Sequence, residues 1–141
     1  MATASVDFAN TLAGLGLGEG WKWDKGSWWL DTPAEFDTHA NAATMIAHHA
    51  RFVAITAAER EDKEIRLDYQ WDLDGKLLSF TTATRENKIA SIVDICPAAD
   101  WVERETYEYF AVDFTGRGSL HPLMTRVGDA VGINLRKEVA E

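Results

Sequence analysis

The feature that most constrains the fold is a strict alternation of apolar and polar side chains between residues 65 and 73. A period of two residues is typical of a β-strand with one buried and one solvated face. The pair Asp74-Gly75 follows directly and favours a tight turn into a second strand over Lys76–Thr84. We therefore predict an antiparallel hairpin with one packed face. Its buried side carries Ile65, Leu67, Tyr69, Trp71 and Leu73, and its solvated side carries Arg66, Asp68, Gln70 and Asp72.

Other strands are indicated on the N-terminal side of this hairpin. Arg51–Thr56 is rich in β-branched and aromatic residues. Two aromatic runs, Trp21–Trp23 and Ser27–Leu30, flank the glycine-containing turn Asp24–Gly26, which predicts a second, shorter hairpin. The sheet is thus expected to be mainly antiparallel.

Two helices are predicted in the same half of the chain. Val6–Leu15 can form a short helix, which the glycines after it end. The sequence from Thr32 to Glu35 has the pattern of a capping box, so a second helix is expected over Pro33–His49. Helices on one face of an antiparallel sheet make a two-layer α+β domain.

A third helix is predicted over Ala98–Phe110, because Pro97 suits a first helical turn. Its expected buried face carries one charge, Glu105, which would need a partner; the other members of this face are Ala98, Trp101, Val102 and Tyr109. On a second face, Asp100, Arg104 and Glu108 are spaced for a solvated ladder of ion pairs.

Composition narrows the range of functions. The net charge of −9 makes nucleic acid an unsuitable partner, because phosphate binding needs clustered Lys and Arg. A single cysteine, Cys96, cannot hold an iron–sulfur cluster or a disulfide framework, and beside Pro97 it is interpreted as a small buried residue. His39, His48 and His49 lack the further ligands that complete a metal cage. We expect no cofactor.

The sequence also gives an expectation for location. It contains no apolar run near eighteen residues, and its first sixteen residues lack the charged and apolar blocks of a signal peptide. A cytoplasmic protein is therefore expected.

Charge and glycine content divide the chain near residue 116. Four cations and three anions follow that point, a balance of +1, so residues 1–116 carry −10 and the whole chain carries −9. We expect residues 1–116 to form the α+β domain and residues 117–141 to form an extended, basic, glycine-containing tail that contacts a partner.

The segment around Pro97 resembles a known family. The residues that carry the resemblance are Ser91, Ile92, Ile95, Pro97, Ala99, Trp101, Glu103, Arg104, Glu105, Phe114, Gly116, Leu135, Arg136 and Lys137. Their pattern is similar to the signature of the C subunit, or 30 kDa-type subunit, of bacterial NADH:quinone oxidoreductase. The matching small subunits of energy-converting nickel–iron hydrogenases have the same signature.

The resemblance implies a cofactor-free structural and assembly subunit in the peripheral arm of a membrane-associated, ion-translocating oxidoreductase. Its implied partners are the large catalytic subunit and the iron–sulfur subunit, at the inner face of the cell membrane, with membrane contact only through the complex. The expected interface residues are Trp101, Glu103, Arg104, Glu105, Arg117, His121, Arg126, Arg136 and Lys137.

Two other functions stay open at this point. A small hydrolase could use the carboxylates of Glu103, Glu105 and Glu108, and a cleft around them would favour it. An aromatic-faced module for sugars or small ligands would need Trp28 and Trp29 exposed.

Overall fold

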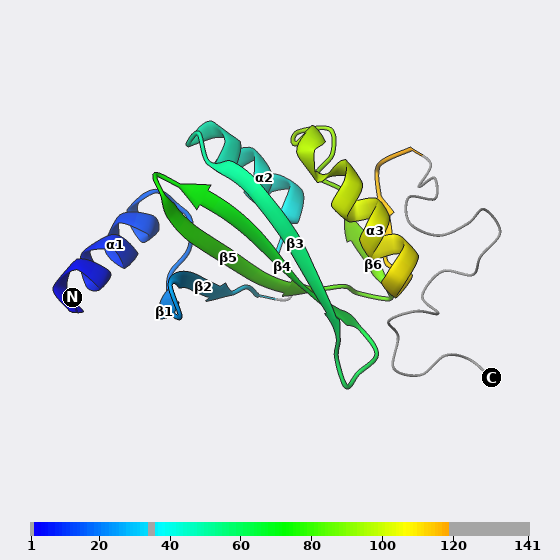
Figure 1. Cartoon of the computed structure of the whole chain (residues 1–141), viewed down its shortest axis with the longest axis horizontal. Helices are drawn as coiled ribbons and strands as arrows, with labels where there is room; N and C mark the ends of the chain where they lie inside the picture. The colour runs from blue at the N-terminus through cyan, green and yellow to red at the C-terminus, as the bar shows by residue number, and fades with distance from the viewer. Residues whose placement is uncertain (1, 34–35, 119–141) are drawn as a thin grey trace.

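The computed structural model describes residues 2–33 and 36–118 as a sheet with helices beside it (Figure 1). A five-stranded sheet has the order β1-β2-β5-β4-β3, and β6 pairs with β7 in a separate ribbon. In chain order the elements are α1 (Ala2–Gly14), β1 (Lys22–Asp24), β2 (Ser27–Asp31), α2 (Thr38–Ala47), β3 (Arg51–Glu59), β4 (Ile65–Leu73), β5 (Lys76–Ala83), β6 (Lys88–Ala90), the 3₁₀ helix η1 (Pro97–Ala99), α3 (Asp100–Phe110) and β7 (Asp113–Thr115).

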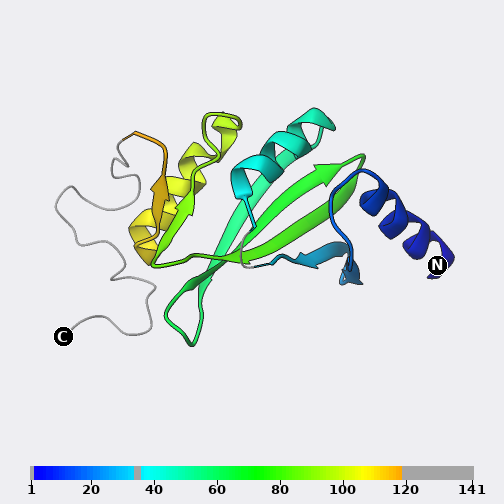
Figure 2. The ribbon, with the colours of Figure 1, turned by 180° about the vertical axis from the view of Figure 1, so that it is seen from behind.

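The sheet is mixed, with antiparallel pairing predominant. β1–β2, β3–β4 and β4–β5 are antiparallel, whereas β2 runs parallel to β5. Helices α2 and α3 lie on the same side of the sheet, and α1 lies at the end of the molecule far from α3 (Figures 1 and 2). The predicted α+β class is confirmed, and the parallel pair β2–β5 is the feature that the local sequence pattern did not reveal.

Both predicted hairpins form, and each uses the same turn chemistry. Asp74 and Gly75 have φ values of 52° and 81°, and Lys25 and Gly26 have 49° and 88°. Two successive residues with positive φ match the right-handed twist of the strands on either side. The carboxylate of Asp72 also accepts the N–H of Gly75 at 2.8 Å, which fixes the longer hairpin.

The alternation in β4 produces the core as predicted. Its apolar side chains are 0–5% exposed, and they meet Phe80 of β5, Met45 of α2 and other buried side chains. One member of the solvated set behaves differently, because Asp68 is only 3% exposed. Thr81 donates to its carboxylate at 2.7 Å, Thr56 at 3.3 Å and Arg66 at 3.1 Å. Four polar side chains therefore form a network across β3, β4 and β5.

Helix α2 begins later than the capping-box pattern predicts. Asp37 is its N-cap and accepts the N–H of Ala40 at 3.0 Å. The hydroxyl of Thr32 instead donates to the carbonyl of Thr81 at 2.8 Å, because β2 reaches Asp31 and keeps Thr32 beside β5. The prediction that Thr32 caps this helix is wrong, and Glu35 lies outside the described residues.

None of the helices formed by residues 2–33 and 36–118 combines the length and the apolar character needed to cross a bilayer.

Candidate functional site

The candidate site is built around α3 and the two segments that hold it. The chain leaves β6, passes through a loop at residues 91–96, and enters η1 at Pro97, which occupies a first helical position as predicted. Helix α3 continues directly from η1 and ends at Ala111, whose φ of 58° is left-handed. The predicted helix over residues 98–110 is therefore confirmed, with its first turn wound as 3₁₀.

A buried carboxylate anchors this helix. Glu103 is 0% exposed, and its two oxygens accept the hydroxyl of Ser91 at 2.6 Å and the N–H of Ile92 at 2.9 Å. A buried carboxylate needs such donors because it has lost its water. The loop before η1 is thus hydrogen-bonded directly to the middle of α3.

Arg117 completes the pairing of this carboxylate. Its Nη1 lies 3.1 Å from Oε1 of Glu103, and its Nη2 contacts the carboxylate of Asp100. The Arg117 side chain is only 9% exposed. Arg104 lies on the other side of Asp100, with 3.7 Å between Nη1 and Oδ2. The expectation that Arg117 is a free cation of the tail is wrong, because its charge is used inside the domain.

The orientation of α3 also differs from its predicted amphipathic face. Glu103, Thr106 and Glu108 are buried, whereas Trp101 is 69% exposed and Glu105 is exposed. The apolar periodicity had placed Trp101 and Glu105 inside and Glu108 in water. The bonds from Ser91, Ile92 and Arg117 decide the rotation, because a bonded carboxylate can replace an apolar side chain at a buried position.

Burial sets the electrostatics of the site. It raises the pKa of Glu103 above its ordinary value, and the bonds from Ser91, Ile92 and Arg117 oppose that rise. Burial, and then the negative charge of Glu103, raise the pKa of Tyr69 on β4. Burial also raises the pKa of the Cys96 thiol, so Cys96 is a protonated, buried side chain and a poor nucleophile.

The three carboxylates of the hydrolase alternative do not converge. Glu103 and Glu108 are buried, and Glu105 lies on the exposed side of the same helix. The bonds to Ser91, Ile92 and Arg117 occupy Glu103. Acid–base chemistry needs two carboxyl groups that face a common substrate position. The arrangement therefore argues against a hydrolase.

The tryptophans near the N-terminus do not form an open binding face. Trp28 is 5% exposed and packs against Phe8 and Trp23, with ring centroids 5.3 and 5.4 Å away. Trp29 is half-buried, and its Nε1 donates to the carbonyl of Asp24 at 3.4 Å. The exposure of Trp28 that would favour an aromatic-faced module is absent.

The histidines are not arranged for a metal. In the part of the chain that the structure describes, no three His, Cys, Asp or Glu side chains are placed to bind one ion. His39 instead pairs with Asp94, with 3.0 Å between Nε2 and each carboxylate oxygen, and this hydrogen bond lowers the pKa of Asp94. The pair ties α2 to the loop before η1.

The remaining predicted interface residues fall after the domain. His121, Arg126, Arg136 and Lys137 lie outside the described residues, so their contribution stays a prediction. Sequence reasoning missed Ser91 as a functional partner of Glu103, although Ser91 was among the residues that carried the resemblance. Its spacing of twelve residues from Glu103 gives no local signal of contact.

Comparison with known proteins identifies the family. A family model described as respiratory-chain NADH dehydrogenase, 30 Kd subunit, matches residues 34–140, well over half of the chain. The chain belongs to this family. The match includes all of α3 and β7, and also Glu103 with its partners Ser91, Ile92 and Arg117. It confirms the resemblance carried by the residues around Pro97.

Curated relatives bear corresponding names. The C subunit of NADH-quinone oxidoreductase from Ruegeria sp. (strain TM1040) is 35% identical over 91 residues, which is 61% of this chain and 45% of the relative. Its counterpart of the same name from Mycolicibacterium gilvum (strain PYR-GCK) is 28% identical over 128 residues, 71% of this chain and 55% of the relative. The chain spans about half the length of these curated relatives.

Solved structures share the fold of this member of the 30 Kd family. A chain of the membrane-bound sulfane sulfur reductase, an archaeal respiratory membrane complex, superposes with a TM-score of 0.67 at 22% identity, covering 82% of this chain and 72% of that one. A trypsin-resistant fragment of Nqo5 superposes with a TM-score of 0.59 at 17% identity, covering 84% of this chain and 98% of the fragment.

The raised pKa of Glu103 predicts a pH dependence. The folded chain holds this proton to a higher pH than the unfolded chain, whose ordinary value is 4.5. The contribution of the group to the free energy of unfolding is therefore complete below 4.5 and is lost as pH rises through the folded value. The wild type should lose stability relative to Glu103→Gln as pH rises.

Urea unfolding of both proteins at several pH values between about 4 and 7 measures this difference. Glu105→Gln, on the exposed side of the same helix, is the matched control for the change in charge. A wild-type advantage that grows with pH would contradict the assignment.

The pairing of Arg117 makes a second prediction. Arg117→Met keeps most of the apolar stem and removes the cation, which leaves Glu103 buried without its counter-charge. We expect the free energy of unfolding to fall by about 3 kcal/mol at pH 8. The control Arg51→Met removes the ion pair between the exposed Arg51 and Asp72, and it should lower the free energy of unfolding by less than about 1 kcal/mol. Equal losses in the two variants would show that burial of the Arg117 pair is unimportant.

Proposed function

We propose that this chain is a non-catalytic subunit of a membrane-associated, ion-translocating oxidoreductase of the NADH:quinone oxidoreductase or energy-converting hydrogenase type. It carries no cofactor of its own and docks on the large catalytic subunit, with the iron–sulfur subunit as a further partner. The assembly lies at the cytoplasmic, inner face of the cell membrane. Family membership and the names of the curated relatives support this proposal.

The observation that carries the proposal is the exposure of Trp101 on α3, a helix whose opposite face is held by the hydrogen bonds of Glu103. Its side chain is 69% exposed, two residues before the fully buried Glu103. A large aromatic group left in water on a rigid element is typical of an interface anchor, because its burial gives much contact area at little conformational cost. Glu105, one turn further along α3, supplies a charge beside it.

The buried contacts give this interface its rigidity. Ser91, Ile92 and Arg117 hold the inner face of α3 through Glu103. The outer face therefore needs no reordering when a partner binds, which removes part of the usual entropic cost of association. In this proposal Glu103 positions the interface, and Trp101 and Glu105 make the contacts.

A pair of tryptophan variants tests the docking role of α3. Trp101→Ala should weaken binding to the co-expressed large subunit by about thirtyfold, the effect of losing an anchor worth about 2 kcal/mol. Its thermal unfolding should stay close to wild type, because the side chain is exposed. Trp23→Ala removes the other strongly exposed tryptophan of the described residues, 53% exposed on β1, and should leave co-purification unchanged. Normal assembly of Trp101→Ala would rule out α3 as the docking face.

A truncation tests the predicted basic tail. Ending the chain after Gly118 removes Arg126, Arg136 and Lys137 but keeps Arg117, which the domain uses. We expect the shortened protein to melt near the wild-type temperature and to lose co-purification with the large subunit, because the tail supplies cations to the partner. An unfolded truncated domain, or undiminished co-purification, would end the proposal of a partner-binding arm.

A further inference from the structure

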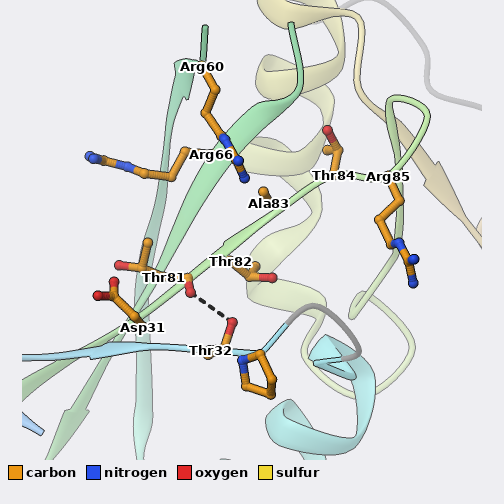
Figure 3. A pocket seen from close by; sticks show the side chains of 10 residues that line it. Asp31, Thr32, Arg60, Arg66, Thr81, Thr82, Ala83, Thr84 and Arg85 are labelled. Atoms are coloured by element: carbon orange, nitrogen blue, oxygen red, sulfur yellow. Dashed lines mark hydrogen bonds between the residues drawn. The ribbon is translucent and has the colours of Figure 1, made fainter. Parts of the chain in front are cut away.

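A groove on the sheet carries polar groups that the proposed docking face does not use. It has a volume of about 460 Å³ and lies where β2 and β5 end, beside the turn between β3 and β4 (Figure 3). That turn projects from the sheet on the side away from α2 (Figures 1 and 2). No residue of α3 lines the groove.

Three side chains of the groove have no partner within residues 2–33 and 36–118. They are the carboxylate of Asp31, the hydroxyl of Thr82 and the guanidinium group of Arg85. Neighbouring polar groups at the same end of β5 are occupied: Thr84 accepts the N–H of Ile65 at 3.0 Å, and Thr32 donates to Thr81. The groove therefore offers an acceptor, a hydroxyl and a cation together.

Two more arginines add donors to this groove. Arg60 contacts Asp62 at 2.9 Å and Arg66 contacts Asp68 at 3.1 Å, in each case through Nη2. A guanidinium group has five N–H donors, so each of these arginines keeps donors for another acceptor. Their side chains are 49% and 52% exposed. In Figure 3, Arg60 and Arg66 lie on one side of β5 and Arg85 lies on the other.

We infer that this groove binds an acidic, extended peptide segment of a partner protein. Carboxylates of the segment pair with the three arginines, because guanidinium groups bind carboxylates through charge-assisted, often bidentate, hydrogen bonds. Asp31 accepts a backbone N–H of the segment, and Thr82 bonds to its polar backbone. The volume falls in the range of roughly 300–1,000 Å³ that is usual for binding pockets.

The composition of the groove favours a peptide over a free phosphate or a nucleic acid. A phosphate brings concentrated negative charge and few donors, so it uses the arginines and is repelled by the carboxylate of Asp31. A peptide with acidic side chains presents both donors and acceptors. Three of the five arginines among residues 1–116 line this groove, two of them already paired with Asp62 and Asp68.

This site is independent of docking through α3. It uses other elements, and its occupant is an acidic segment, whereas the predicted tail brings cations to a partner. A chain that fails in one of the two tests can succeed in the other.

The test uses the full-length chain and a ten-residue peptide of alternating Glu and Ser. Calorimetric titration should detect binding, and amide NMR signals of Thr82, Ala83 and Arg85 should shift. Arg85→Glu should weaken binding about tenfold or more, because it replaces an attraction by a repulsion. Its melting temperature should stay near wild type, since Arg85 is exposed and its side chain has no partner among the described residues.

Two controls separate this site from general charge attraction. Arg51→Glu makes the same change of charge at the far end of β3, outside the groove, and should alter peptide affinity less than twofold. The same peptide with Gln in place of Glu should bind at least tenfold more weakly. The inference is overturned if no binding is detected, if Arg51→Glu weakens binding as much as Arg85→Glu, or if pyrophosphate binds as tightly as the peptide.

Discussion

The C-terminal part of this fold depends on the buried carboxylate of Glu103. It joins three segments that are separate in the chain: the loop at Ser91 and Ile92, helix α3, and Arg117 after β7. A carboxylate at 0% exposure is compatible with folding only when its oxygens are hydrogen-bonded and its charge is compensated. The same bonds therefore fix the positions of α3 and of the Arg117 side chain.

This anchoring explains why α3 presents an aromatic residue to solvent. Once Glu103 faces the body, the geometry of a helix places Trp101 and Glu105 on the outer side. In an isolated protein this arrangement is unfavourable, because the carboxylate of Glu103 is buried while the indole of Trp101 is left in water. In a subunit of a larger assembly it is favourable, since the exposed indole can be buried by a partner.

A second buried carboxylate organises the polar side of the sheet. Asp68 is 3% exposed and collects Thr56, Arg66 and Thr81 from three strands. The strand pattern had assigned this residue to water. Asp68 and Glu103 are therefore both buried carboxylates that accept hydrogen bonds from segments far apart in the chain.

Local features of the fold could be predicted because neighbouring residues determine them. The period of two in β4 and the positive φ values at Asp74 and Gly75 depend on side chains within one hairpin, and the helical start at Pro97 is equally local. Family membership also followed from the residues around that proline.

Tertiary structure decided everything that depends on residues far apart in the chain. The parallel pairing of β2 with β5 joins residues about fifty positions apart, and it moved the start of α2 from Thr32 to Asp37. The rotation of α3 depends on Ser91 and Arg117, twelve and fourteen residues from Glu103. Sequence periodicity reflects only the spacing of apolar side chains, so it predicts that Trp101 is buried. It carries no information on hydrogen bonds from distant residues, which allow Glu103 to be buried and leave Trp101 exposed.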